Sequence, residues 1–286
     1  MAYQKVLILG ANGMLGHDLA EVFSDLKPIL WDQGDLDITD EKQVGQKLAE
    51  LKPELVINAA AYTDVDGAEL NEELASRVNG YAVGYLAAAC HKLGAVLVHF
   101  STEYVFSGRQ EAGYAEIDMP DPLNAYGRSK ALGEKLLRQN CEMYYLIRAS
   151  WLYGRSPQIG KPRGLNFVET MLKLARAGQE IKVVNDQFGK PTFARDLAFG
   201  TRQLIDKKKP CGIYHLVNEN VCSWYDFAKK IFAIENIEVS LSPISSADYN
   251  QTTPRPKYSV LINTKTEPLR NWEEALDEYM SDKKTS

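Results

Sequence analysis

Residues 6–16 read VLILGANGMLG, and this stretch decides the fold. Its first four residues are all apolar, which is typical of a strand buried on both faces. Three glycines follow at once, Gly10, Gly13 and Gly16, and a helix is expected to begin near Met14. Glycine permits a tight turn and lets backbone N–H groups approach a pyrophosphate, towards which the helix points its positive end. The stretch therefore predicts a dinucleotide-binding turn; a glycine-rich turn without a ligand is the alternative.

Apolar runs and helix-like stretches alternate along the first half of the chain. The runs lie at 6–9, 28–31, 55–60, 95–100 and 144–150, and the helix-like stretches at 17–26, 41–51, 72–93 and 124–138. Nearly continuous apolar strands that alternate with helices indicate a parallel sheet covered on both faces. The predicted fold class is α/β, a doubly wound parallel sheet of Rossmann-like type.

The regular alternation of apolar runs and helix-like stretches ends after residue 150. Residues 155–165 are rich in Gly, Pro and charge and predict an exposed loop; helices are then expected at 166–177, 194–206 and 222–234, and strands at 181–184 and 213–217. We expect a dinucleotide-binding domain at residues 1–153. Residues 154–286 are expected to form mainly a smaller, interleaved substrate lobe, with segments at about 181–217 returning to the first domain.

The composition excludes several classes of protein. The 286 residues carry a formal net charge of −5, so no electrostatic argument favours nucleic acid or an acidic membrane as partner. The first apolar run is too short for a signal sequence, and no run is long enough to span a bilayer. The four cysteines form no C-x-x-C pair, so they predict neither a disulfide framework nor a metal site. A reducing, cytoplasmic location is expected.

Two further segments suit a dinucleotide. Asp32 ends the second expected strand, at about the distance from the glycine turn that suits a hydrogen bond to an adenosine ribose. Residues 31–40 contain no Lys or Arg, which favours NADH over NADPH. Asp32 could instead merely begin a loop, with Asp37 and Ile38 at the adenine edge. The run 58–63, NAAAYT, closes another strand with small residues that leave room for a flat cofactor, or that simply allow helix–sheet packing.

A hydroxyl, a phenol and an amine are expected to meet at the edge of the sheet. Thr102 lies two residues beyond the strand at 95–100, and Tyr126 and Lys130 lie one turn apart on the helix at 124–138. In a ketone reduction Tyr126 would protonate the developing alkoxide, and Thr102 would hold the carbonyl oxygen. Lys130 would lower the pKa of the phenol and grip the nicotinamide ribose. Taken alone, the Tyr–Lys pair favours a solvated helix face; together with the glycine turn and Thr102 at a strand end, it favours an acid beside the amine that tunes it.

In these blocks the chain resembles the extended short-chain dehydrogenases/reductases, and within them the dTDP-4-dehydrorhamnose reductase family. The resemblance covers residues from about 5 to about 265. The matching blocks are GANGMLG, NAAAYTDVDGAE, STEYVFSG, PLNAYGRSKALGE, RASWLYG, NFVETML, NDQFGKPT and GIYHLVN. WLYG, DQFGKPT and GIYH are more specific than the superfamily motifs.

The resemblance implies an activity. The family reduces the ketone of dTDP-4-dehydro-L-rhamnose (dTDP-6-deoxy-L-lyxo-4-hexulose) with NADPH or NADH to dTDP-L-rhamnose, for cell-surface polysaccharide. Its hydroxyl, tyrosine and lysine match Thr102, Tyr126 and Lys130. The expected cofactor contacts are Gly10, Asn12, Gly13, Met14, Leu15, Gly16, Asp32, Asp37, Ile38, Ala59, Ala60, Ala61, Tyr62, Thr63, Tyr126 and Lys130. The expected substrate contacts are Thr102, Glu103, Tyr104, Trp151, Asn166 and Arg255.

Within that set, two residues have a stated role. Trp151 matches a substrate-stacking tryptophan, although a core aromatic at a strand end is the alternative. Arg255 matches an Arg-Pro segment that meets a diphosphate.

The chain departs from the family at two places. Glu103 stands where the family usually has Asp, which moves the carboxylate outward by one methylene. Some members hold a metal at a dimer interface, but Arg195 and His17 do not suit that site, so no metal is carried over. We therefore expect a monomer or a weak homodimer.

Two other functions remain open. A non-catalytic regulatory subunit of methionine adenosyltransferase shares the fold and many blocks, but it would not need the set Thr102, Tyr126 and Lys130. An epimerase or dehydratase that recycles tightly held NAD is the second. Superfamily dehydratases place two acids after the threonine, whereas here Glu103 is followed by Tyr104.

Overall fold

The computed structural model describes residues 3–160, 164–249 and 252–285. Its centre is a six-stranded sheet in the order β10-β5-β4-β3-β1-β2, and every neighbouring pair is parallel. The strands are β1 (Val6–Leu9), β2 (Ile29–Trp31), β3 (Leu55–Asn58), β4 (Val96–Thr102), β5 (Tyr144–Ala149) and β10 (Gly212–His215). The chain order reverses between β1 and β3, and ligands of such sheets bind at this point. The predicted α/β class is confirmed.

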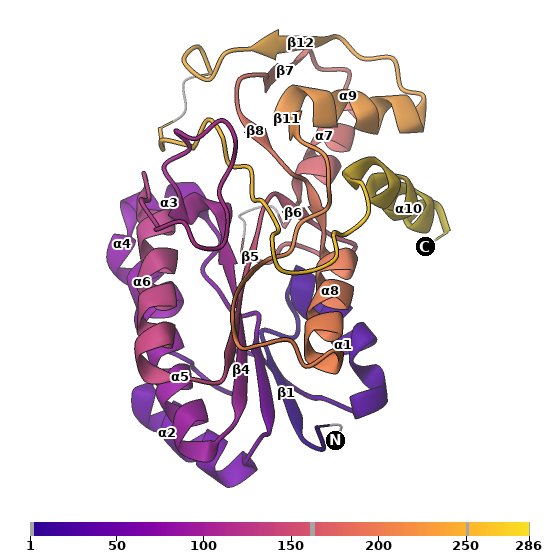
Figure 1. Ribbon diagram of the computed structural model, residues 1–286. Helices are drawn as coiled ribbons and strands as arrows, with labels where there is room; N and C mark the ends of the chain where they lie inside the picture. Colours follow the sequence, from indigo (N-terminus) through magenta and orange to yellow (C-terminus); the bar gives the residue numbers. More distant parts are fainter. Residues whose placement is uncertain (1–2, 161–163, 250–251, 286) are drawn as a thin grey trace.

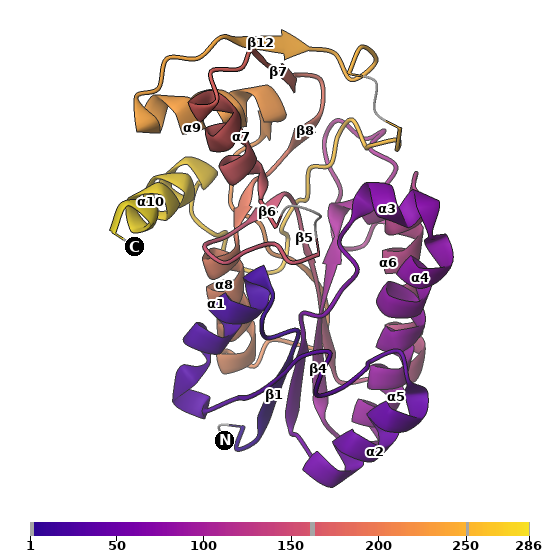
Figure 2. The ribbon, with the colours of Figure 1, turned by 180° about the vertical axis from the view of Figure 1, so that it is seen from behind.

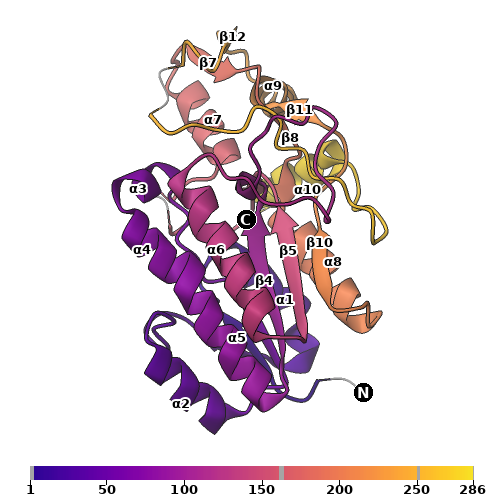
Figure 3. The same cartoon turned by 60° about the vertical axis from the view of Figure 1, so that its left-hand side comes forward.

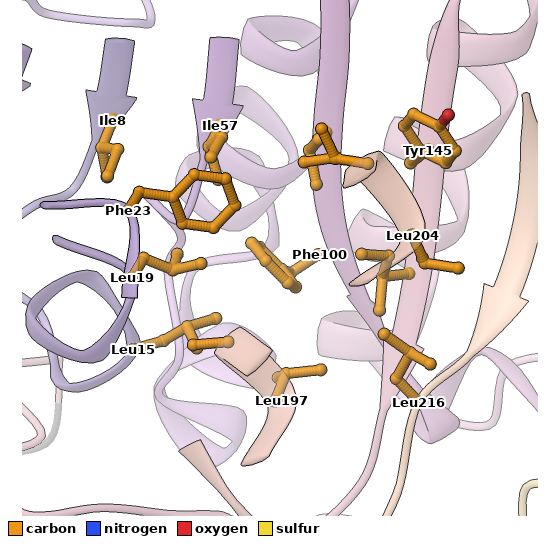
Figure 4. Close-up of a cluster of buried hydrophobic side chains, with 14 of the residues drawn as sticks. Ile8, Leu15, Leu19, Phe23, Ile57, Phe100, Tyr145, Leu197, Leu204 and Leu216 are labelled. Atoms are coloured by element: carbon orange, nitrogen blue, oxygen red, sulfur yellow. The ribbon is translucent and has the colours of Figure 1, made fainter. Parts of the chain in front are cut away.

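Helices cover both faces of the sheet (Figures 1 and 2). One face carries α1 (Met14–Val22) and α8 (Ala194–Asp206); the other carries α2 (Glu41–Leu51), α5 (Ala82–Leu93) and α6 (Ala125–Asn140). Figure 4 shows the apolar cluster under α1 and α8, with Ile8, Ile57 and Phe100 from the sheet facing Leu19 and Leu197 from the helices. This burial on both faces explains why the strand sequences are almost wholly apolar.

The smaller lobe lies beyond the carboxyl ends of the strands, at the top of Figure 1. Its helices are α7 (Phe167–Arg176), α9 (Trp224–Glu235) and α10 (Trp272–Thr285). Three short strand pairs complete it: β6 (Leu152–Tyr153) with β9 (Thr192–Phe193), β7 (Ile181–Val184) with β12 (Leu241–Ile244), and β8 (Phe188–Gly189) with β11 (Cys222–Ser223). A second aromatic-rich core holds it together, including Tyr153, Phe193, Phe227 and Tyr279.

Within 181–217, different segments have different destinations. Helix α8 and strand β10 join the large sheet domain, whereas β7 pairs with β12 in the smaller lobe. Individual helices and strands of this segment therefore belong to different domains. The domain boundary near residue 153 stays a prediction. Of the loop expected at 155–165, residues 161–163 lie outside the described part of the chain.

The helix expected at 72–93 is not uniform. It consists of α4 (Glu72–Ser76), a π-helical turn (Arg77–Tyr81) and α5, and the short helix α3 (Val65–Leu70) precedes it. The π turn contains Asn79, which is buried and donates its side-chain N–H to the carbonyl of Tyr62 at 2.9 Å. The π turn therefore places the side-chain amide of Asn79 against the segment that follows β3. Short 3₁₀ turns occupy Ser24–Leu26 and Glu103–Val105.

A buried ion pair ties the sheet to α6. Arg148 on β5 and Glu134 on α6 are joined at 2.7 Å, with side chains only 1% and 2% exposed. Glu134 also accepts the hydroxyl of Ser101 at 2.6 Å, and Arg148 lies 3.3 Å from Nε2 of His215 on β10. Arginine can only donate, so Nε2 of His215 accepts and Nδ1–H donates to the carbonyl of Ile262 at 3.0 Å. The network fixes β4, β5, β10 and α6 relative to one another.

Within the described residues, no helix is both long and apolar enough to cross a bilayer.

Candidate active site

The glycine turn after β1 is closely packed. Gly10 has φ of +72°, and a Cβ there would lie 2.7 Å from the backbone nitrogen of Ala60. A Cβ on Gly16 would overlap the carbonyl oxygen of Gly10. Helix α1 begins at Met14 with Gly13 as its N-cap; no side chain caps it and its first turn holds no acid. The uncapped first turn of α1 presents its N–H groups and the positive end of the helix to a pyrophosphate, so the residues present suit a dinucleotide.

Asp32 is bound to that turn. Its Oδ2 accepts the backbone N–H of Asn12 at 2.9 Å, and its Oδ1 accepts that of Gln33 at 2.9 Å. Asp37 lies nearby and accepts both N–H and hydroxyl of Thr39, which lowers its pKa. Asp32 and Asp37 therefore both hold the backbone of the segment that follows β2 through hydrogen bonds.

Two cations from outside residues 31–40 approach this region. The ammonium of Lys47 lies 5.8 Å from the ring centroid of Trp31. The charge of Arg77 contributes to the lowered pKa of Asp37, after the hydrogen bonds from Thr39. Residues 31–40 themselves contain no Lys or Arg, but α2 and the π turn each place one cation near them in the folded protein.

The segment after β3 is held in an extended path. Asn58 accepts the N–H of Ala60 at 3.1 Å, and Asn79 accepts that of Tyr62 at 2.9 Å. The Thr63 hydroxyl is buried without a partner among the described residues, next to Gly160. Sequence reasoning missed Asn79; a polar residue within a mostly apolar helical stretch is the only signal that points to it.

Thr102 is the hydrogen-bonding centre of the site. It is the last residue of β4, and its Oγ1 donates to Oε2 of Glu103 at 2.7 Å. The same oxygen accepts the backbone N–H of Tyr104 at 3.2 Å, and Thr102 lies close enough to Tyr126 to act on the pKa of that phenol, which it lowers. The structure thus brings the expected hydroxyl and phenol together.

Asn124 places Tyr126 opposite Thr102. Asn124 caps α6 by accepting the N–H of Gly127 at 2.8 Å, which sets Tyr126 in the first turn. The other end of the same amide donates to the carbonyl of Pro254 at 2.9 Å, which ties α6 to the smaller lobe. Figure 3 shows α6 running beside β4, so that its start lies at the carboxyl edge of the sheet.

The electrostatics differ from the expectation. Burial raises the pKa of Tyr126 above its usual value, and the charges of Glu103 and Tyr104 raise it further. Lys130 does not offset this, because its Nζ donates to the carbonyl of Phe100 at 3.0 Å. Burial lowers the pKa of Lys130 itself to about 8, with Glu134 opposing the change. The lowered phenol pKa expected from the sequence is therefore absent in the described site.

Glu103 is the most deeply buried acid of the site. Its side chain is almost inaccessible, and the residue is 3% exposed. Burial raises its pKa to about 7, while hydrogen bonds from Thr102 and from the backbone N–H groups of Glu103 and Trp151 act in the opposite direction.

The aromatic and amide side chains expected to bind substrate are largely engaged inside the protein. Trp151, with φ of +46°, is 9% exposed and stacks on Trp224. Asn166 caps α7, and its amide donates to Gly154 at 3.0 Å and to Tyr279 at 3.2 Å. Its oxygen accepts the N–H of Glu169 at 3.1 Å, and because both amide N–H groups are engaged, Asn166 has no donor left for a sugar.

Arg255 reaches the site from the C-terminal segment. Its Nη2 lies 2.9 and 3.0 Å from the two carboxylate oxygens of Asp66, near the start of α3. Its charge opposes the rise that burial causes in the pKa of Tyr104, and the backbone N–H of Tyr104 donates to Thr102. The arginine therefore stands at the rim beside the Thr102 group, and a contact with a diphosphate stays a prediction.

Known proteins place this arrangement in a family. A family model described as RmlD substrate binding domain matches residues 4–285. The spore coat polysaccharide biosynthesis protein SpsK of Bacillus subtilis is 39% identical over 288 residues, covering 99% of each chain. A dTDP-4-dehydrorhamnose reductase of Burkholderia thailandensis is 38% identical, over 91% of this chain and 90% of its own.

A solved structure agrees with these relatives. The dTDP-4-dehydrorhamnose reductase of Bacillus anthracis, in complex with NADP, superposes with a TM-score of 0.92 at 38% identity, covering 99% of this chain and 100% of its own. The chain therefore belongs to the RmlD substrate binding domain family, the family of the dTDP-4-dehydrorhamnose reductases.

Proposed function

We propose that this chain reduces the 4-ketone of dTDP-4-dehydro-L-rhamnose to dTDP-L-rhamnose with a reduced nicotinamide dinucleotide. The observation that carries the proposal is the grouping of Thr102, at the carboxyl end of β4, with Tyr126 and Lys130 in the first turns of α6, where Lys130 is bonded to the Phe100 carbonyl of β4. Relatives named for this reaction cover nearly the whole chain, which supports the same substrate class here.

The chain's residues divide the work as follows. Thr102 and Tyr126 direct their hydroxyl groups at the carbonyl oxygen, which orients the ketone and stabilises the charge that develops on it. Tyr126 then gives its proton to that oxygen, so that one hydride on carbon and one proton on oxygen complete the alcohol. A reduced nicotinamide, when bound, supplies the hydride. Lys130, buried and bonded to the Phe100 carbonyl, fixes the first turns of α6 against β4.

Cofactor choice forms part of the proposal. The carboxylate of Asp32 beside the glycine turn favours a free ribose diol and disfavours a ribose phosphate, so we infer a preference for NADH. Lys47 and Arg77 lie close enough to this region to keep NADPH usable. Comparing kcat/KM for the two cofactors tests this, and a preference for NADPH would count against the role given to Asp32.

A direct assay tests the reaction. Purified protein with NADH or NADPH and dTDP-4-dehydrorhamnose should oxidise the cofactor and yield dTDP-L-rhamnose in equal amount. No turnover with either cofactor would remove the proposal. A partner protein recovered in fixed ratio would instead favour a regulatory subunit, and NAD that copurifies and resists dialysis would favour an epimerase or dehydratase.

A further inference from the structure

The side-chain amide of Asn79, in the π turn, makes three hydrogen bonds. Its Oδ1 accepts the backbone N–H of Tyr62 at 2.9 Å, and its Nδ2 donates to the carbonyl of Tyr62 at 2.9 Å. The same nitrogen donates to Oγ of Ser129 on α6 at 3.0 Å. Both protons of Nδ2 are therefore used, and the donor from Tyr62 fixes which end of the amide carries the oxygen. Because Asn79 is 1% exposed, these bonds are shielded from bulk water.

Ser129 extends this contact to the turn of α6 that carries the expected acid. Its hydroxyl donates to the backbone carbonyl of Tyr126 at 2.7 Å, and one lone pair of the same oxygen accepts Asn79. Ser129 is 0% exposed. A continuous series of hydrogen bonds therefore runs from the backbone of Tyr62, through Asn79 and Ser129, to the backbone of Tyr126. We call this series the Asn79 bridge.

Close packing prevents the π turn from sliding along α6. A Cβ on Gly133, one turn beyond Ser129, would overlap the carbonyl oxygen of Asn79. A Cβ on Gly80 would lie 2.6 Å from Cδ2 of Leu132. The π turn and α6 are thus in contact at the level of the backbone, which fixes the depth at which the amide of Asn79 sits. Single π turns within helices occur frequently at functional sites.

The proposed reaction needs exactly such a fixed separation between two segments. The hydride goes to the carbonyl carbon and the proton to the oxygen bonded to it, so both donors have to reach adjacent atoms. Tyr62 belongs to the segment 58–63 that is expected to line the dinucleotide, and Tyr126 is the expected proton donor. Lys130 ties α6 to β4 through the Phe100 carbonyl, whereas the Asn79 bridge ties α6 to the segment that follows β3.

We propose that Asn79 is a positioning residue that holds Tyr62 and, through Ser129, Tyr126 at a fixed separation, so that the hydride donor and the proton donor meet at one carbonyl group. The inference rests on the proposed function. Asn79 and Ser129 act through backbone groups of their neighbours, so neither is assigned a chemical step.

Two variants separate the two ends of the bridge. Ser129→Ala removes the bond to Tyr126 and leaves both bonds to Tyr62, so kcat should fall about 10–100-fold while KM for NADH stays unchanged. Asn79→Ala also releases Tyr62, so KM for NADH should rise about 3–10-fold in addition. Thr201→Val is the matched control, because the Thr201 hydroxyl is equally buried and donates to the carbonyl of Leu197 at 2.8 Å within α8. It should keep wild-type kcat and KM.

The experiment measures kcat, KM for NADH and the solvent deuterium isotope effect on kcat for wild type and the three variants. A displaced acid slows proton transfer, so the isotope effect should rise in Ser129→Ala. A merely structural role would reduce the amount of active protein and leave the isotope effect unchanged. An unchanged isotope effect in Ser129→Ala, or an equal loss of kcat in Ser129→Ala and Thr201→Val, would overturn the proposal. Ser129→Ala decides this even where Asn79→Ala does not fold.

Hydrogen exchange tests the bridge without turnover. The amide proton of Tyr62 is bonded to Asn79, so its exchange should be faster in Asn79→Ala than in wild type and unchanged in Thr201→Val. Equal protection of Tyr62 in Asn79→Ala and wild type would refute the bridge. A wild-type protein that turns over no keto-sugar refutes the proposed function instead, and the exchange rate of Tyr62 still decides whether Asn79 holds this segment.

Discussion

The indole rings of Trp151 and Trp224 lie face to face, with centroids 3.6 Å apart and planes 10° apart. Phe167 packs on the other side of this pair, 4.6 Å from the Trp224 centroid. One face of Trp151 is therefore covered by Trp224, and Gly189 lies against the edge that holds Cζ2. With 9% of the residue exposed, the structure has Trp151 as a core aromatic, and its contact with a deoxysugar stays a prediction.

Gly189→Ala should disturb this tryptophan. A Cβ at position 189 would lie 2.7 Å from Cζ2 of Trp151, so the indole must shift from its position stacked on Trp224. We expect a loss of about 1–3 kcal/mol in the free energy of unfolding. KM for the keto-sugar should rise more than kcat falls. Urea denaturation and steady-state kinetics measure the two effects.

Gly45→Ala is the matched control. Gly45 lies on the exposed part of α2, and a Cβ there meets no atom within 4 Å. Alanine should stabilise the helix by about 0.5–1 kcal/mol. A Gly189→Ala protein as stable as wild type, with unchanged KM, would show that Trp151 is not held as described.

Tyr126→Phe should remove the acid and leave the binding sites intact. We expect kcat to fall about 10²–10⁴-fold, because the proton donor is lost while the cofactor turn is untouched. Fluorescence titration should give an unchanged Kd for NADH. Tyr104→Phe is the comparison, since its ring packs edge-on against Tyr126 at 5.5 Å and its loss should cost much less kcat. Wild-type turnover by Tyr126→Phe would place the acid elsewhere.

Arg148→Leu should be strongly destabilising. It leaves Glu134 buried without its cation, which costs about 3–5 kcal/mol. The free energy of unfolding in urea measures this cost.

The control pair joins α6 to α4. Arg128 and Glu72 also form a close ion pair at 2.7 Å, but their side chains are 44% and 46% exposed. Arg128→Leu should therefore cost no more than about 1 kcal/mol. If Arg148→Leu and Arg128→Leu lost the same free energy of unfolding, burial would not explain the contribution of the Arg148–Glu134 ion pair to stability.

His215 predicts a loss of stability in mild acid. Burial, then the charge of Arg148, lowers its pKa to about 4, whereas the unfolded chain has an ordinary histidine. Between these values the unfolded state binds the proton and the folded state does not, so stability falls as the pH drops from about 6.5 to about 4. The loss amounts to about 3 kcal/mol for a shift of this size. Chemical denaturation at several pH values measures it, and His215→Asn should show a shallower slope than wild type.

Asp66→Asn should strengthen binding of the nucleotide. Asp66 pairs with Arg255 at 2.9 Å, so a diphosphate that meets Arg255 has to displace a carboxylate. Removing that charge should lower the Kd for dTDP by about 2–5-fold, since an exposed ion pair contributes no more than about 1 kcal/mol. Calorimetric titration gives the value, and Arg255→Gln should change it in the opposite direction. Weaker binding by Asp66→Asn would remove Arg255 from the diphosphate site.

The sequence by itself determined the parallel sheet and the place of its ligand edge. Apolar runs such as 6–9 can only be buried on both faces, and glycines at 10 and 16 are needed where the turn leaves no room for a Cβ. The order of Thr102, Tyr126 and Lys130 also followed from local pattern, because helix spacing and strand ends are set within a few residues.

Only the tertiary structure decided the electrostatics and the aromatic contacts of the site. The raised pKa of Tyr126, the cations near Asp37 and the stacking of Trp224 on Trp151 all depend on residues far apart in the chain. A pKa is set by burial and by neighbouring charges in space, which no window of sequence contains. The same holds for Asn79, whose role follows from a π turn that brings its amide to Tyr62.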